Sequence, residues 1–98
     1  MKVEVLGIRL LNGDRPLRAF ADIRLEDSIV IREFRVIKEN GKRLRVASPQ
    51  LSWKGPDGQI QYKTIVTLLS DDQKGAVELA ILKAFTGELE KLNAKERS

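Results

Sequence analysis

The stretch FRVIKENGKRLRVASPQ, residues 34–50, decides the fold. Its two ends are rich in apolar residues, and its polar centre contains the dipeptide Asn40-Gly41. Asn-Gly between two extended runs is the strongest short-range signal of a β-hairpin. We therefore predict strands over residues 29–37 and 44–47, joined by a turn in which Asn40, Gly41 or both have positive φ.

The chain on either side of this hairpin also has the pattern of strands. Residues 2–11 are rich in β-branched side chains, and residues 17–26 alternate apolar and polar side chains, which is the period of a half-buried strand. Residues 29–37 are apolar on both faces in places, so we expect this strand to be central in the sheet or bulged. Residues 60–68 predict a fifth strand, and we interpret residues 50–54 before it as a loop.

The periodicity changes at Ser70, where a helix is predicted to begin. Ser70 and Gln73 have the spacing of a capping box. Beyond them, apolar residues three and four positions apart form one stripe: Val77, Ala80, Ile81, Ala84, Phe85 and Leu89. We expect Gly87 either to break this helix or to weaken it, and residues 93–98 to form a frayed, charged tail.

These elements predict an α+β domain: an antiparallel β-sheet of about five strands with a C-terminal α-helix packed on one face. The 98 residues are enough for one domain, which we place at residues 1–92. We expect the second face of the sheet to carry Phe20 and Phe34, while Leu79 and Leu82 widen the helix stripe. A domain this small is not expected to cover both surfaces, so the pattern predicts a symmetric homodimer.

Composition excludes several kinds of catalytic site. The chain contains no Cys and no His, which removes Ser-His and Cys-His nucleophile pairs and zinc ligation by these residues. Two adjacent carboxylate pairs remain, and we interpret Glu26-Asp27 as a turn and Asp71-Asp72 as a helix start. No glycine-rich phosphate loop is present. We therefore expect no enzyme activity, no cofactor, no metal site and no small-molecule substrate.

The sequence also gives an expectation for the cellular compartment. No apolar run approaches the roughly 20 residues that a membrane helix needs. Residues 1–5 include the acidic Glu4 where a signal peptide would have a long apolar region. We expect a cytoplasmic protein that does not bind membranes.

The positive charge is concentrated in the hairpin region. The net charge is +4, but residues 32–54 hold seven basic and two acidic side chains, whereas residues 70–98 hold five basic and six acidic ones. Arg43 and Arg45 share one strand face, roughly 7 Å apart, which is about the spacing of phosphates along a nucleic-acid strand. The alternative is that these charges keep a sheet edge soluble and discourage edge pairing. Both interpretations stand on the sequence alone.

Trp53 and Lys54 are neighbours in the segment after the hairpin. A Trp beside a cation can stack on a nucleic-acid base, and it can equally fill the edge of a core or an interface. On the nucleic-acid interpretation, the candidate contacts are Lys42, Arg43, Arg45, Lys54 and Trp53.

Four short motifs follow one another along the chain: Arg35-Val36-Ile37, Asn40-Gly41, Val46-Ala47-Ser48-Pro49 and Pro56-Asp57-Gly58. In this order they resemble the stage V sporulation protein G family (SpoVG, the septation regulator), and the resemblance covers about residues 3–86. It implies a small bacterial cytoplasmic protein that forms homodimers, binds DNA and RNA, and regulates gene expression, sporulation or septation without catalysis. The alternative is a protein-protein interaction module of the same fold that does not bind nucleic acid.

Overall fold

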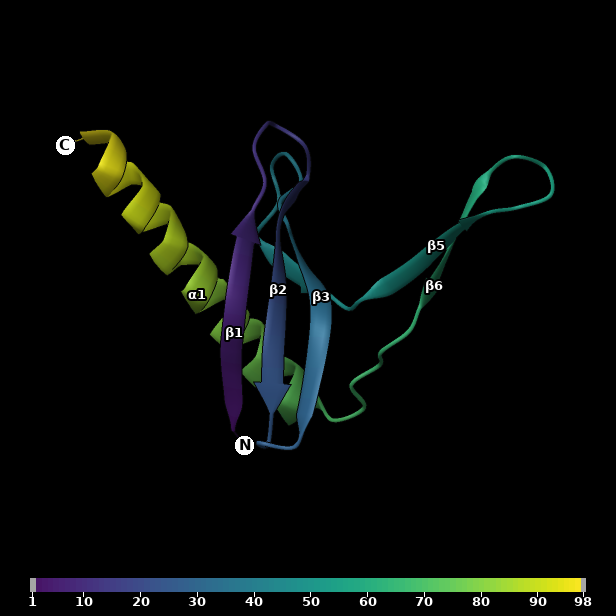
Figure 1. Ribbon diagram of the computed structural model, residues 1–98, viewed down its shortest axis with the longest axis horizontal. Helices are drawn as coiled ribbons and strands as arrows, with labels where there is room; N and C mark the ends of the chain where they lie inside the picture. Colours follow the sequence, from purple (N-terminus) through teal and green to yellow (C-terminus); the bar gives the residue numbers. More distant parts are fainter. Residues whose placement is uncertain (1, 98) are drawn as a thin grey trace.

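The computed structural model describes residues 2–97, which form six β-strands and one α-helix. In chain order these are β1 (Val3–Leu10), β2 (Leu17–Leu25), β3 (Ile29–Ile37), β4 (Arg45–Ala47), β5 (Gln50–Lys54), β6 (Ile60–Thr64) and α1 (Asp71–Arg97). The strands form two antiparallel sheets, one in the order β1-β2-β3-β4 and one of β5 and β6. Figure 1 shows α1 crossing one face of the larger sheet, while β5 and β6 extend away from it. The α+β class is confirmed, but the expected single sheet of about five strands is corrected to six strands in two sheets.

The core lies between α1 and one face of the four-stranded sheet. The buried positions of β2 alternate as the sequence predicted: Ala19, Ala21, Ile23 and Leu25. The helix contributes buried side chains that lie four residues apart: Val77, Ile81 and Phe85. Each large apolar side chain buried in this way stabilises the fold by about 1.5–3 kcal/mol. The contact between helix and sheet is therefore the main source of stability.

A β-bulge in β3 brings Phe34 into this core. The register between β2 and β3 shifts so that Arg32 and Glu33 together face the single residue Asp22. Glu33 has φ 71°, and the extra residue keeps Ile31 and Phe34 on the same face although they are three positions apart. The strand is both central and bulged, as its apolar pattern indicated.

The bulge corrects the prediction for the second face of the sheet. We expected Phe34 to lie there beside Phe20, but Phe34 is 1% exposed and belongs to the core. Phe20 does lie on the open face, where the guanidinium carbon of Arg9 is 5.4 Å from the centre of its ring. The alternation of β3 was read without the extra residue, so its second half was assigned to the wrong face.

The Asn40-Gly41 dipeptide marks a turn inside a longer loop. The loop between β3 and β4 spans residues 38–44. The N–H of Lys42 donates to the carbonyl oxygen of Glu39 at 3.0 Å. Gly41 has φ 75°, whereas Asn40 does not have positive φ, which excludes a type I′ turn and fits a type II turn. The predicted positive φ is thus confirmed at Gly41.

Residues 50–54 were expected to form a loop, but they form strand β5, which pairs with β6 along its whole length. Strand β6 ends at Thr64 and not at residue 68, because its partner strand ends there. We call residues 50–64, which comprise the two strands and their turn, the arm.

The predicted start of α1 is confirmed. The N–H of Gln73 donates to the Ser70 hydroxyl oxygen at 3.2 Å, which satisfies one of the unpaired donors of the first turn. Gly87 does not interrupt the helix, whose backbone passes Asn93, where we expected a frayed tail, and continues to Arg97. Among residues 2–97, no helix is both long enough and apolar enough to cross a membrane.

Replacing Gly41 with Val should destabilise the domain by about 1–3 kcal/mol, because a β-branched residue is strained at positive φ. No atom lies within 4 Å of the added Cβ, so a steric clash there does not contribute. The measurement is the midpoint of urea unfolding. Gly75→Ala is the matched control, because Gly75 lies in α1 with open space around it, and it should stabilise by about 0.5–1 kcal/mol. An unchanged midpoint for Gly41→Val would contradict the turn.

Candidate nucleic-acid interface

One end of the four-stranded sheet carries a surplus of positive charge. There the β1–β2 loop lies beside the β3–β4 loop (Figure 1), and the N–H of Lys38 donates to the carbonyl oxygen of Pro16 at 2.8 Å. We call the basic side chains of these loops and the adjoining strand ends the basic end: Arg15, Arg18, Arg35, Lys38, Lys42, Arg43 and Arg45. The same segments hold only Asp14 and Glu39 as acids, so seven positive and two negative charges leave +5.

Glu39 lies between two of these cations. Lys42 Nζ is 3.2 Å from Glu39 Oε2, and Arg45 Nη2 is 3.6 Å from Glu39 Oε1. The hydrogen bond and the charge of Lys42, followed by the charge of Arg45, lower the pKa of Glu39. All three side chains are at least 40% exposed, so solvent screens these pairs and they exchange readily. An incoming phosphate therefore competes with one carboxylate for two cations.

Two arginines of the basic end are anchored to backbone carbonyls. Arg18 Nη1 donates to the oxygen of Gly13 at 3.1 Å, and Arg35 Nη2 donates to the oxygen of Ser48 at 3.2 Å. Burial and the nearby charge of Arg45 lower the pKa of Arg35, which remains protonated because an arginine starts so high. These two side chains fix the shape of the end and add to its positive potential.

The remaining cations face solvent, as strand alternation predicted for Arg43 and Arg45. Leu44 and Val46 pack against the core, so the arginines beside them point outward. Arg43 forms no salt bridge with any residue in the range 2–97, and the same holds for Arg15 and Lys38. Phosphate contacts at these three side chains displace no acidic partner of this kind.

The structure brings together some of the residues that the sequence suggested and separates others. Lys42, Arg43 and Arg45 lie in the basic end. Trp53 and Lys54 lie in β5, on the arm, and Figure 1 shows the arm extending from the opposite side of the sheet to α1, away from the β3–β4 loop. Their role in nucleic-acid binding stays a prediction, but it would be a separate contact.

Sequence reasoning missed four members of the basic end: Arg15, Arg18, Arg35 and Lys38. Arg15 and Arg18 precede or begin β2, while Arg35 and Lys38 lie near the end of β3. These segments meet because the start of β2 pairs with the end of β3. The signal was the antiparallel pairing itself, which would have placed the β1–β2 turn next to the charged hairpin loop.

The open face of the four-stranded sheet also carries basic residues, but they are paired. The ion pairs there are Arg9–Glu33, Arg24–Glu4 and Arg32–Asp22. Arg24 Nη2 lies 2.6 Å from Glu4 Oε2, and Arg32 Nη1 lies 3.3 Å from Asp22 Oδ2. This face is close to neutral, so the basic end is the stronger candidate for a polyanion.

The two carboxylate pairs have the structural roles that the sequence suggested. Glu26 and Asp27 form a turn in which φ is 53° and 56°, and Lys2 Nζ is 2.9 Å from Asp27 Oδ2. Asp71 and Asp72 lie in the first turn of α1, where negative charge suits the helix dipole. Among residues 2–97, no three acidic side chains are grouped in a way that could hold a metal ion.

Replacing Lys42 with Met should raise the pKa of Glu39 toward its ordinary range, and Arg45→Met should raise it less. The folded state lowers this pKa, so the ion pairs stabilise the fold at pH above the unfolded-state pKa. That contribution disappears as the pH falls through the folded-state pKa. An NMR titration of the Glu39 carboxyl group measures the shift. Lys83→Met, on the helix, is the control that should change nothing, and an unmoved pKa in Lys42→Met would contradict the geometry.

Comparison with known proteins identifies the family. The SpoVG family model matches residues 1–87. Relatives from three bacteria carry names that pair SpoVG with septation. The Bacillus subtilis relative is 32% identical over 98 residues, which cover 98% of this chain and 96% of the relative. The Bacillus licheniformis relative is 31% identical with the same coverage, and the Finegoldia magna relative is 30% identical over 97 residues, 98% of this chain and 84% of the relative.

The family match spans most of the four-stranded sheet, the arm and the first half of the helix. The relatives cover nearly the whole chain, including the segments that form the basic end. The chain therefore belongs to the SpoVG family of bacterial septation proteins, which is not a known enzyme family.

Proposed function

We propose that this protein is a bacterial regulator that binds DNA or RNA through the phosphate backbone and acts as a cytoplasmic homodimer in the control of gene expression, sporulation or septation. The observation that carries the proposal is the basic end. Three segments that are distant in the sequence converge there and leave a local charge of +5. Its cations are exposed, partly unpaired and close to one another, which suits an extended polyanion better than a single small anion.

The proposed binding mode is electrostatic and tolerant of sequence. Lys42, Arg43 and Arg45 contact phosphates, while Arg18 and Arg35 hold the surface in shape. Nothing in the basic end inserts an aromatic ring between bases, and no helix is presented to a groove there. Affinity then comes mainly from counterions that the cations release from the nucleic acid. Trp53 and Lys54 add to binding only as a separate contact from the arm.

A second candidate function is a protein-protein interaction module that does not bind nucleic acid. The observation that favours it is the arm, in which all ten strand residues are exposed. Four of them are large and apolar: Leu51, Trp53, Ile60 and Tyr62. The two functions differ in the salt dependence of binding, because apolar contacts do not release counterions.

The double change Arg43→Ala and Arg45→Ala should make the salt dependence of nucleic-acid binding shallower. Each lost phosphate contact removes about 0.7–0.9 from the slope of log affinity against log salt. We expect the slope to fall by about 1.5–2 units per chain engaged. Both side chains are exposed, so the free energy of unfolding should change by less than about 0.5 kcal/mol. The measurement is titration of labelled single-stranded RNA and duplex DNA at several salt concentrations.

The matched control is Lys83→Ala with Lys91→Ala, which removes the same charge from the helix. It should keep the parent slope. Trp53→Ala and Lys54→Ala test the arm separately. If the parent shows no saturable binding at low salt, the nucleic-acid proposal is wrong and the interaction module stands. If the parent binds and the double arginine variant keeps its affinity and slope, the basic end is not the site.

Glu39→Gln should tighten nucleic-acid binding. The change removes the carboxylate that holds Lys42 and Arg45 and increases the local positive charge by one. A unit charge at 4 Å contributes about 1 kcal/mol in water, so we expect affinity to rise about two- to fivefold at low salt. Asp57→Asn, in the turn of the arm, changes the net charge equally and should have a smaller effect. Equal or weaker binding in Glu39→Gln would contradict the proposed competition.

A further inference from the structure

We infer that the arm is the dimer interface, and that in a symmetric dimer the arms of two copies cross antiparallel, so that Ile60 and Tyr62 of one copy cover the pocket at the base of the other copy's arm. This inference rests on the homodimer in the proposed function and is independent of nucleic-acid binding. The partner is a second copy of this chain.

The arm lacks partners within its own chain. Strands β5 and β6 pair with each other and with no other strand, and Figure 1 shows them projecting from the body of the domain. A lone two-stranded hairpin is marginally stable in water. The arm also exposes side chains that normally drive association, since Tyr62 is 64% and Ile60 is 62% exposed. Its composition therefore calls for a covering surface.

The two faces of the arm can be distinguished from the strand register. Gln50 pairs with Thr64, Ser52 with Tyr62 and Lys54 with Ile60. Directly opposite residues in an antiparallel pair point to the same side. One face, which we call the tyrosine face, therefore carries Gln50, Ser52, Lys54, Ile60, Tyr62 and Thr64. The other, the tryptophan face, carries Leu51, Trp53, Gln61 and Lys63.

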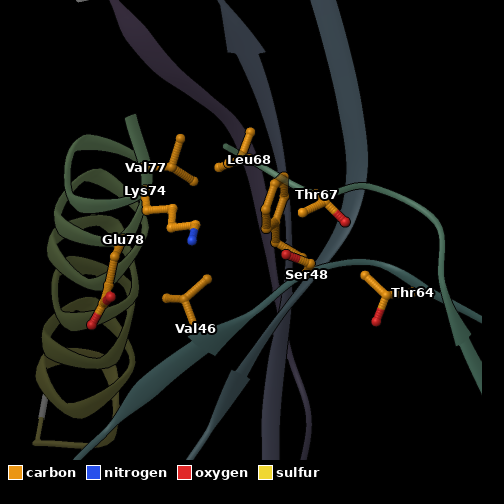
Figure 2. Close-up of a pocket in the computed structure, with 9 residues that line it drawn as sticks. Val46, Ser48, Thr64, Thr67, Leu68, Lys74, Val77 and Glu78 are labelled. Atoms are coloured by element: carbon orange, nitrogen blue, oxygen red, sulfur yellow. The ribbon is translucent and has the colours of Figure 1, made fainter. Parts of the chain in front are cut away.

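A pocket of about 330 Å³ lies at the base of the arm, on the side of the tyrosine face. Thr64, the last residue of that face, lines it. Figure 2 shows Val46, Leu68 and Val77 around the apolar part of the pocket, with Lys74 and Glu78 of α1 along one side. A cavity of this size accepts a large apolar or aromatic side chain, and it opens toward the surface along which the tyrosine face runs.

The charges of the two regions are complementary. The tyrosine face carries the cation Lys54 near the tip of the arm. The start of α1, which borders the pocket, carries Asp71, Asp72 and Glu78 against the single cation Lys74. Electrostatic attraction therefore favours the tip of one arm at the base of another.

Two-fold symmetry makes these features fit together. Each strand of the arm has five residues, so the arm is about 17 Å long at the usual rise of about 3.3 Å per residue. When two tyrosine faces pack antiparallel, the tip of each arm lies at the base of the other. Lys54 then approaches the acidic start of the partner's helix, while Ile60 and Tyr62 lie along the pocket. Both contacts form twice, and the interface closes without leaving a free copy of either surface.

Sedimentation velocity of the full chain at tens of micromolar tests the inference. We expect the parent to sediment as a dimer of the 11.1 kDa chain. Tyr62→Glu and Ile60→Glu should each raise the dissociation constant by at least about tenfold, because a charge replaces an apolar contact at the centre of the interface. Leu51→Glu and Trp53→Glu are matched controls on the tryptophan face and should leave the dimer unchanged. Urea unfolding of each variant as a monomer shows whether the core remains intact.

A charge exchange tests the contact between copies more specifically. Lys54→Glu and Glu78→Lys should each weaken the dimer, and the double variant should recover most of the lost affinity. A parent that is monomeric would overturn both this inference and the proposed homodimer. A parent dimer that survives Tyr62→Glu and Ile60→Glu would overturn the inference alone. The same holds if those variants weaken RNA binding while the dimer persists, because the arm would then be a nucleic-acid surface.

Discussion

The side chain of Asp22 holds the bulge on which the rest of the sheet depends. One carboxylate oxygen accepts a hydrogen bond from the N–H of Glu33 at 3.1 Å, and the other lies 3.3 Å from Arg32 Nη1. Glu33 has φ 71°, a conformation that costs a non-glycine residue on the order of 1–3 kcal/mol. The carboxylate offsets this strain and fixes where the extra residue lies. Without the bulge, the period of two would turn Phe34 away from the helix.

The position of the basic end follows from the same constraint. Once Phe34 faces the helix, Val36 does too, and Val36 pairs with Val46 of β4. The direction of Val46 then sets the direction of its neighbours, so Arg45 points to solvent. Core packing thus decides which side of β4 carries the cations, although the cations add little to stability themselves. A surface that binds a polyanion is in this way oriented by buried apolar contacts on the other side of one strand.

Much of this arrangement could be predicted from local patterns. The alternation of β2 and the Ser70 cap depend on neighbouring residues, and both are confirmed. The position of Phe34 could not be predicted in this way, because a bulge is a local exception to the alternation that reveals a strand. Residues 50–54 were read as a loop because both faces of β5 are exposed and no face shows a consistent apolar pattern.

The candidate site was predictable to the extent that it is continuous in sequence. Lys42, Arg43 and Arg45 stand in one run, and their charge is visible without a structure. Arg15 and Arg18 join them only through the pairing of β2 with β3, and this requires a register that the sequence does not state. The restraint of Lys42 by Glu39 depends on the shape of a seven-residue loop. A loop longer than the expected two-residue turn leaves several possible paths for the chain, and composition alone does not choose among them.

The basic end and the arm complement each other energetically. One basic end has a local charge of +5 with one acid in direct competition, which is a modest electrostatic surface for a single chain. A dimer presents two such ends on one rigid body, and binding of the second end becomes intramolecular once the first has bound a strand. The counterions released at both ends then add in the salt dependence. A hairpin that is exposed on both faces is a cost for the monomer, but it makes the dimer in which two weak phosphate surfaces act as one. The tryptophan face remains open in that dimer, so Trp53 is still accessible to a base without any change in the interface.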